Sequence, residues 1–185
     1  MATTQDFRNG MAFKLDDDLY FIVEFQHVKP GKGGAFVRTK LKRVDTGAVI
    51  ERTFRSGEKV EDVRIERRSM QYIYREGELF VFMDTESYEQ VHVGADIVGN
   101  DADLLKENET VDILYGEGRA LVVELPFHVE QEVVHTEPGV RGDTAQGATK
   151  PAQIESGATI QVPLFINEGD VIQVDTRSRE YLSRK

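Results

Sequence analysis

The stretch that decides the fold is residues 19–44, LYFIVEFQHVKPGKGGAFVRTKLKRV. Residues 19–28 are rich in Tyr, Phe, Ile and Val and alternate imperfectly between apolar and polar, which is typical of a half-buried strand. Residues 29–34, KPGKGG, interrupt this pattern with the strongest turn chemistry in the chain, and residues 35–44 resume an extended pattern. The sequence therefore predicts a β-hairpin with a glycine-rich tip.

The same kind of pattern continues along the rest of the chain. Short runs rich in β-branched and aromatic residues are separated by turn signals such as DTG at 45–47 and GEG at 116–118. One short segment, residues 102–106, favours a helix. The further strands are expected at residues 48–54, 69–75, 79–83, 88–93, 111–115, 119–124, 128–135, 159–162, 171–174 and 180–183. Strands of this length and spacing predict an all-β fold of small barrels or sandwiches.

Two breaks divide this pattern into three modules. Residues 61–68 are strongly charged, and Pro126 cannot donate to a central ladder. We therefore expect three modules, at residues 1–63, 64–127 and 128–185. Because modules of about 60 residues have marginal cores, we expect the first two to pack tightly against one another.

Composition excludes several classes of protein. The chain has 185 residues and no cysteine, so disulfides, thiol catalysis and cysteine-ligated zinc are excluded. No apolar run approaches the roughly 18 residues that span a bilayer, and the first eleven residues lack the pattern of a signal peptide. We expect a soluble cytoplasmic protein with no membrane partner.

Charge is distributed unevenly over the chain, whose formal net charge is −10. Residues 1–63 carry 11 basic and 10 acidic side chains, whereas residues 64–127 carry 6 and 14. Residues 28–43 contain six basic side chains and no acidic one: Lys29, Lys32, Arg38, Lys40, Lys42 and Arg43. This run is either a solvated strand face or a surface that faces phosphates. We favour the second interpretation, an RNA-binding hairpin on a protein that nucleic acid otherwise repels.

Signatures of enzymes are missing from the sequence. Gly31-Lys32 lacks the earlier glycine and the following Ser or Thr of a phosphate-binding loop, and no Gly-x-Ser-x-Gly pattern occurs. The four histidines, at 27, 92, 128 and 135, are dispersed without the spacing of metal ligands. We predict no enzymatic activity, no catalytic residue, no metal site and no cofactor.

Several motifs together resemble one known family. They are KPA at 150–152, Gly157, IQVP at 160–163, Ile166 and Gly169, joined by VKPGKG at 28–33, GDT at 142–144 and the ending from Val174 to Arg184. In these motifs the whole chain resembles the bacterial translation elongation factor P family. A paralogous branch of that family lacks the lysine at the loop tip. Because Lys32 and the GDT motif are both present, the chain resembles the main branch.

The resemblance implies an L-shaped protein in which an SH3-like (KOW-like) barrel is followed by two OB-folds. It also implies a monomeric, non-catalytic factor that binds the 70S ribosome between the peptidyl and exit sites. Such factors stimulate peptide-bond formation on prolyl peptidyl-tRNA and relieve stalling at consecutive prolines.

The same resemblance implies roles for individual residues. Lys32 is the residue that contacts peptidyl-tRNA and that a dedicated enzyme modifies where modification occurs. The hairpin backbone around it is formed by Pro30, Gly31, Gly33 and Gly34. The remaining RNA contacts comprise Gly142, Asp143 and Thr144 at the messenger codon in the exit site, with Tyr181 and Arg184 toward the small subunit. For residues 142–144, the structural alternative is a β-turn capped by the aspartate.

A second class of function stays open from the residues alone. A generic single-stranded RNA-binding OB protein with no ribosomal role would use exposed aromatic side chains as stacking platforms. Phe21, Phe25, Phe80 and Phe82 instead lie within hydrophobic strands, which favours a place in the core.

Overall fold

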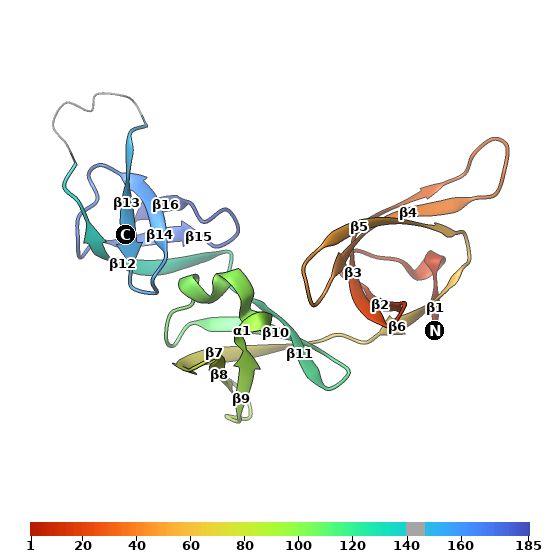
Figure 1. Cartoon of the computed structure of the whole chain (residues 1–185), viewed down its shortest axis with the longest axis horizontal. Coiled ribbons are helices and arrows are strands. Elements are labelled where there is room, and N and C mark those ends of the chain that lie inside the picture. The colour runs from red at the N-terminus through yellow and green to blue at the C-terminus, as the bar shows by residue number, and fades with distance from the viewer. Residues whose placement is uncertain (140–146) are drawn as a thin grey trace. The chain divides into compact units, whose positions relative to one another are not determined.

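The computed structural model describes residues 1–139 and 147–185 (Figure 1). Over these residues, the strands form three sheets with the orders β1-β6-β2-β3-β4-β5, β11-β10-β7-β8-β9 and β14-β13-β12-β15-β16. The strands of the first sheet are β1 (Ala2–Thr3), β2 (Ala12–Leu15), β3 (Asp18–Val28), β4 (Phe36–Arg43), β5 (Val49–Arg55) and β6 (Lys59–Val63). Those of the second are β7 (Glu66–Glu76), β8 (Leu79–Asp84), β9 (Gln90–Gly94), β10 (Thr110–Gly116) and β11 (Arg119–Glu124). Those of the third are β12 (His128–Thr136), β13 (Thr149–Ile154), β14 (Thr159–Pro163), β15 (Val171–Asp175) and β16 (Tyr181–Arg184).

Helix is confined to three short segments of the described chain: η1 (Thr4–Asp6), α1 (Ala95–Val98) and η2 (Gly99–Leu104). None of them is long and apolar enough to cross a membrane. The all-β class expected from the strand pattern is confirmed.

The hairpin that decides the fold is formed by β3 and β4. Its register shifts between Ile22 and Glu24, so that Val23 is an extra, exposed residue in β3. This bulge returns Phe25 to the inner face, and it explains why the sequence of this strand alternates imperfectly. Ile22 and Leu41 pair across the hairpin and are both fully buried in the core of the first sheet.

Besides the two-residue β1, three strands were not predicted because their composition hides them. β2 is short, β6 is rich in charge, and β13 contains Pro151. Pro151 is tolerated because the ladder from β12 to β13 ends at the pair Thr136–Ala152, so no amide of residue 151 is needed on that side. The helix expected at 102–106 was misplaced, since the helical segments run from Ala95 to Leu104. Residues 66–68, counted as part of a charged separator, belong to β7.

The chain divides into two compact units. The first comprises Met1–Arg67 together with Leu114–Val122, the tip of the β10–β11 hairpin. Within this unit Leu121 shares a buried cluster with Ala12 and Leu19, and Lys14 Nζ lies 2.5 Å from Glu117 Oε1. The tip of that hairpin is thus packed against the first sheet.

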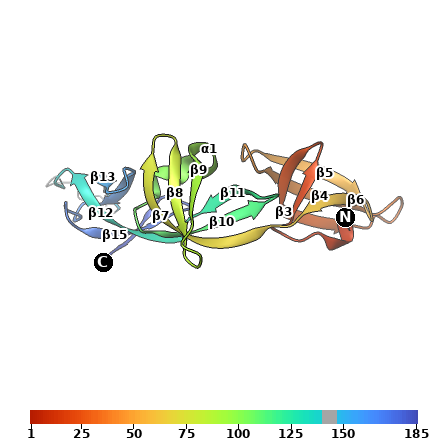
Figure 2. The same cartoon turned by 90° about the horizontal axis from the view of Figure 1, so that it is seen from below.

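The second unit comprises Arg68–Ile113 and Val123–Lys185, so it holds the rest of the second sheet and all of the third. Figure 2 shows β7, β8 and β9 of this unit side by side. Within it, the end of η2 is inserted into the third sheet's core, where Leu104 is fully buried beside Val129, Ile154 and Ile172.

Hydrogen bonds fix this insertion. Gln131 Nε2 donates to the carbonyl of Leu104 at 3.0 Å, and Ser156 Oγ donates to the carbonyl of Asp103 at 2.7 Å. Arg179 Nη2 completes the contact at 2.6 Å from Asp103 Oδ2. We call these five residues, Asp103, Leu104, Gln131, Ser156 and Arg179, the η2 joint.

Candidate functional site

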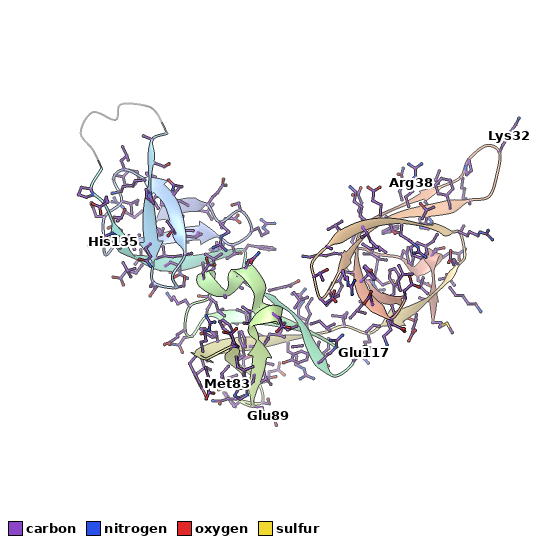
Figure 3. The ribbon with its side chains drawn as sticks, viewed as in Figure 1. Lys32, Arg38, Met83, Glu89, Glu117 and His135 are labelled. Carbon is purple, nitrogen blue, oxygen red and sulfur yellow. The ribbon has the colours of Figure 1, made fainter. Side chains whose placement is uncertain are left out.

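The tip of the β3–β4 hairpin is the first candidate site. The last pair of the ladder is Val28–Phe36, so residues 29–35 form the loop beyond it. Figure 3 shows Lys32 at the far end of this loop, pointing away from the barrel. Residues 29–34 are all exposed, and Lys32 makes no ion pair within the described part of the chain. The end of the loop therefore presents the amine of Lys32 to solvent, without an ion pair to the described residues.

Glycine determines how closely another molecule can approach this tip. Gly33 has φ +110°, a left-handed conformation that disfavours any residue with a side chain. At Gly31 and Gly34 a Cβ would meet no atom within 4 Å, so the backbone is open on these sides. The arrangement suits close contact between the main chain and a large polyanion.

The predicted basic residues separate into two groups. Arg38, Lys40 and Lys42 alternate along β4 and are exposed, so they lie on one face of the strand (Figure 3 labels Arg38). Lys40 Nζ is 3.1 Å from Glu24, whereas Arg38 and Lys42 make no ion pair in the described residues. Lys29 lies at the base of the tip loop and is exposed. This face of β4 therefore presents three basic side chains to solvent.

Arg43 has a different environment. Its Nη2 lies 2.7 Å from Asp18 and its Nε 2.7 Å from Asp45, which follows β4 in the next turn. The hydrogen bond that the guanidinium donates to Asp45 is the main reason that the pKa of Arg43 is raised. The structure therefore ties Arg43 into the fold and leaves the charges of Arg38 and Lys42 available to a ligand.

A hollow of about 310 Å³ is lined by residues of β3, of the basic strand β4 and of β5. Its lining includes Arg38, Lys40 and Arg52 together with Glu24 and Glu51. Lys40 lies between the two glutamates, with which it is paired in the ladders of β3 and β5. The hollow is consequently mixed in charge, and its net attraction for phosphate rests on the two arginines.

The predicted residues of the third module are described only in part. Gly142, Asp143 and Thr144 lie outside the described residues. Tyr181 and Arg184 are both on β16, where the ring of Tyr181 packs partly against the third core. The Arg184 guanidinium lies 5.3 Å from the centre of the Phe165 ring, with Nη1 3.9 Å from Asp170.

Two exposed phenylalanine side chains were missed from the sequence. Phe165 is 57% exposed, and the Arg184 guanidinium lies over its ring. Phe127 is 70% exposed, and the Arg177 guanidinium lies 4.7 Å from the centre of its ring. Each aromatic residue is next to a turn rather than inside a strand, and this was the signal in the sequence. By contrast, Phe80 and Phe82 are buried as expected.

No cluster of three His, Asp or Glu side chains suited to a metal ion occurs among residues 1–139 and 147–185. His135, labelled in Figure 3, lies 3.2 Å from Glu168 and 3.7 Å from Glu137.

Comparison with known proteins accounts for nearly the whole chain. Residues 3–60 match the elongation factor P (EF-P) KOW-like domain, residues 65–123 the elongation factor P (EF-P) OB domain, and residues 129–184 the C-terminal domain of elongation factor P. These matches define a translation factor in which a KOW-like domain is followed by an OB domain and a C-terminal domain, in agreement with the family resemblance.

Curated relatives agree with this assignment over their full length. Elongation factor P of Ruminiclostridium cellulolyticum is 54% identical over 184 residues, which cover 100% of this chain and 99% of the relative. Elongation factor P of Acidothermus cellulolyticus is 56% identical over 184 residues, covering 100% and 98%. The chain therefore belongs to the elongation factor P family, and so to the translation elongation factors.

Solved structures extend the likeness in fold. A eukaryotic translation initiation factor 5A from Methanococcus jannaschii superposes with a TM-score of 0.53 at 23% identity, covering 66% of this chain and 92% of that one. The fold is thus shared at an identity too low to carry function.

Proposed function

We propose that the chain binds the 70S ribosome between the peptidyl and exit sites and stimulates peptide-bond formation at consecutive prolines by positioning peptidyl-tRNA. The observation that carries this proposal is the exposed Lys32 at a glycine-flanked tip, on a chain that belongs to the elongation factor P family. The protein acts in the cytoplasm as a monomer and without a cofactor.

The difficulty that such a factor overcomes is geometric. The proline ring fixes φ and restricts its neighbour, so a peptidyl-prolyl end does not readily hold its reactive carbonyl in line. A side chain that reaches the transfer centre orders the terminal nucleotides of the tRNA. Binding free energy gained elsewhere on the factor then offsets the entropy of alignment. About 3 kcal/mol recovered in this way accelerates transfer roughly a hundredfold.

Lys32 acts through the length of its side chain, which extends from the tip toward the tRNA. A compact charge on a flexible stem docks against phosphates and sugars, and its amine is also a chemical handle for extension by a modifying enzyme. Lys29, Arg38, Lys40 and Lys42 hold the hairpin on the tRNA backbone. Arg43 supports this surface through Asp18 and Asp45.

The third module supplies a second point of attachment in this proposal. Residues Gly142, Asp143 and Thr144 face the exit-site codon, since hydroxyl, carboxylate and backbone groups can read the edges of unpaired bases. Tyr181 and Arg184 lie toward the small subunit.

The test is the rate of proline-tripeptide formation on ribosomes with purified variants. We expect Lys32→Ala to abolish the stimulation and Lys32→Arg to restore it only poorly, because an extension specific to lysine is lost. Lys59→Ala, which removes another exposed lysine of the same sheet, is the matched control and should stimulate normally. Stimulation by Lys32→Ala at the rate of the unchanged protein would refute the proposal.

The basic face has its own test. The triple charge reversal of Arg38, Lys40 and Lys42 to Glu should weaken ribosome association and flatten its dependence on salt, with each lost phosphate contact removing about 0.7–0.9 from the log–log slope. Reversing three exposed glutamates of the second module that lie outside this face, Glu76, Glu78 and Glu107, is the control. Equal losses from both sets would show that the face is only solvated.

A generic single-stranded RNA-binding protein is the second candidate, favoured by the Phe127–Arg177 and Phe165–Arg184 pairs. It predicts micromolar or tighter binding of unstructured oligonucleotides in the absence of ribosomes, lost when both phenylalanines are changed to Ala. We expect no such binding at physiological salt.

A further inference from the structure

The same six-residue turn occurs twice in the second unit. Residues 84–89 read DTESYE and join β8 to β9, while residues 175–180 read DTRSRE and join β15 to β16. Each turn closes the hairpin at one edge of its sheet. Four of the six positions are identical, so the two differ only at the third and fifth.

The two turns share a set of hydrogen bonds centred on their aspartates. Asp84 Oδ1 accepts the amides of Glu86 and Ser87 at 2.8 and 3.1 Å, and Asp175 Oδ1 accepts those of Arg177 and Ser178 at 2.8 and 3.0 Å. These amides lower the pKa of both aspartates, because they bond to the ionised form of each carboxylate. Structure in this turn is therefore specified by the four shared residues.

The fifth residue of each turn is held in a left-handed conformation. Tyr88 has φ 63° and Arg179 has φ 62°, and each donates its amide to the carbonyl of the turn's aspartate, at 2.9 and 2.8 Å. Neither residue is a glycine, so this conformation is unfavourable and the rest of the turn maintains it. The turn presents one side chain at a fixed position.

In the turn of the third sheet, the side chain at the fifth position has a partner within the same chain. Arg179 reaches Asp103 at 2.6 Å and the carbonyl of Asn100 at 3.3 Å, so its turn docks onto the η2 segment. Tyr88 occupies the same position in the other turn and is 71% exposed. Its side chain takes part in no ion pair, ring contact or hydrogen bond within the described chain, so the second docking position has no internal partner.

The charges around Tyr88 indicate which kind of partner can bind there. The two positions that differ are Glu86 and Tyr88 here, against Arg177 and Arg179 in the other turn, and Glu89 follows at once. Residues 64–127 carry 14 acidic and 6 basic side chains, so they repel a phosphate backbone. An exposed tyrosine ring attracts guanidinium and ammonium groups through its face, and neighbouring carboxylates add to that attraction.

We propose that the β8–β9 turn is a docking point for an arginine- or lysine-rich segment of a partner protein, with Tyr88 as its anchor. This goes beyond the proposed function, because it assigns a separate surface and a partner class that is protein rather than RNA. It does not depend on how Lys32 acts.

The experiment uses the full-length protein and two probes, the peptide (Arg-Gly)6 and the oligonucleotide A12. Binding is followed by amide NMR shifts and by titration. The peptide should shift the amides of residues 84–89 and leave those of 175–180 unchanged. The double variant E86R/Y88R converts DTESYE into DTRSRE, a sequence that this chain already folds into the turn, and it should weaken peptide binding at least about tenfold.

The matched control is E78R/L79R, which makes the same change in charge at the opposite end of β8, where Leu79 is 42% exposed. It should change affinity less than about twofold, and Tyr88→Phe, which keeps the ring, should bind nearly as well as the unchanged protein. Three results would overturn the proposal: peptide shifts centred elsewhere, equal losses from the double variant and the control, or the same amides shifted by A12. None of these results bears on Lys32.

Discussion

The Lys32 tip and the η2 joint stand at opposite extremes of packing. At the tip, residues 29–34 are all exposed, and a Cβ on Gly31 or Gly34 would touch nothing. At the joint, Leu104 is fully buried in the third core, and its neighbour Asp103 accepts hydrogen bonds from Ser156, Ala158 and Arg179. The tip makes almost no internal contacts, whereas the joint combines a buried leucine with several hydrogen bonds.

This difference separates function from stability. A residue without internal contacts can change, or be modified, without cost to folding, and its whole binding capacity is available to a partner. Leu104 belongs to the η2 segment yet lies fully buried in the core of the third sheet, so its loss removes packing from that core. We therefore expect variants of the joint to change the free energy of unfolding and variants of the tip to change activity.

The largest expected effect on stability is that of Leu104→Ala. Removing a fully buried leucine costs about 2–5 kcal/mol, because the cavity left behind relaxes only in part. Denaturant unfolding should show this loss, while Leu79→Ala, at a leucine 42% exposed, should cost far less. Equal losses from the two variants would show that η2 is not part of the third core.

A smaller effect is expected from Arg179→Ala. The variant leaves the Asp103 carboxylate without its ion pair, and Asp103 Oδ1 already has no hydrogen-bond partner. Because both side chains are about a third or more exposed, solvent screens the interaction and the loss should be about 1 kcal/mol or less. Arg119→Ala, which removes an exposed arginine of β11, is the control and should unfold like the unchanged protein. A loss above that of Leu104→Ala would mean that the ion pair, not packing, holds the joint.

The tip could be predicted from the sequence, and the joint could not. The KPGKGG run announces a turn by local chemistry alone, and its place in a hairpin follows from the strands on either side. Leu104 lies in a polar segment, GNDADLL, whose burial depends on a sheet formed some 25 to 70 residues later. For the same reason the helix was misplaced, since tertiary contact and not propensity fixes its end.

Among the predicted site residues, the sequence identified the run of basic side chains but not the partners that these side chains have in the fold. Alternation puts Arg38, Lys40 and Lys42 on one face and Arg43 on the other, and this could have been read from the strand period. The ion pair of Arg43 with Asp18 joins residues 25 positions apart, which no local pattern reveals. The repeated turn DTxSxE was visible in the sequence, yet only the structure shows that the fifth side chain is the one presented.

Glu109 offers a pH-dependent measure of the region near the joint. Burial raises the pKa of its carboxyl, with a smaller opposing effect from Lys106 and His128 and a reinforcing one from Glu130. The folded protein therefore holds this proton more tightly than the unfolded chain, and the ionised carboxylate lowers stability at pH 7. Glu109→Gln should raise the free energy of unfolding at pH 7, and this gain should disappear as the pH falls below the ordinary pKa of 4.5, where both states are protonated. A gain independent of pH would assign the effect to packing instead.

The smallest effect on stability is expected from Lys32→Ala, which is the sharpest test of the comparison. The side chain makes no hydrogen bond or ion pair in the described residues, and it lies beyond the last pair of the ladder, Val28–Phe36. Its removal should change the free energy of unfolding by less than about 0.5 kcal/mol. Gly33→Ala at the same tip should cost more, because φ +110° is unfavourable for alanine although the nearest atom to its Cβ would be 4.0 Å away. Parallel denaturant curves for the two variants and the unchanged protein make the measurement. If Lys32→Ala destabilised the protein as much as Gly33→Ala, the lysine would have a structural role, and any loss of activity could no longer be assigned to its reach.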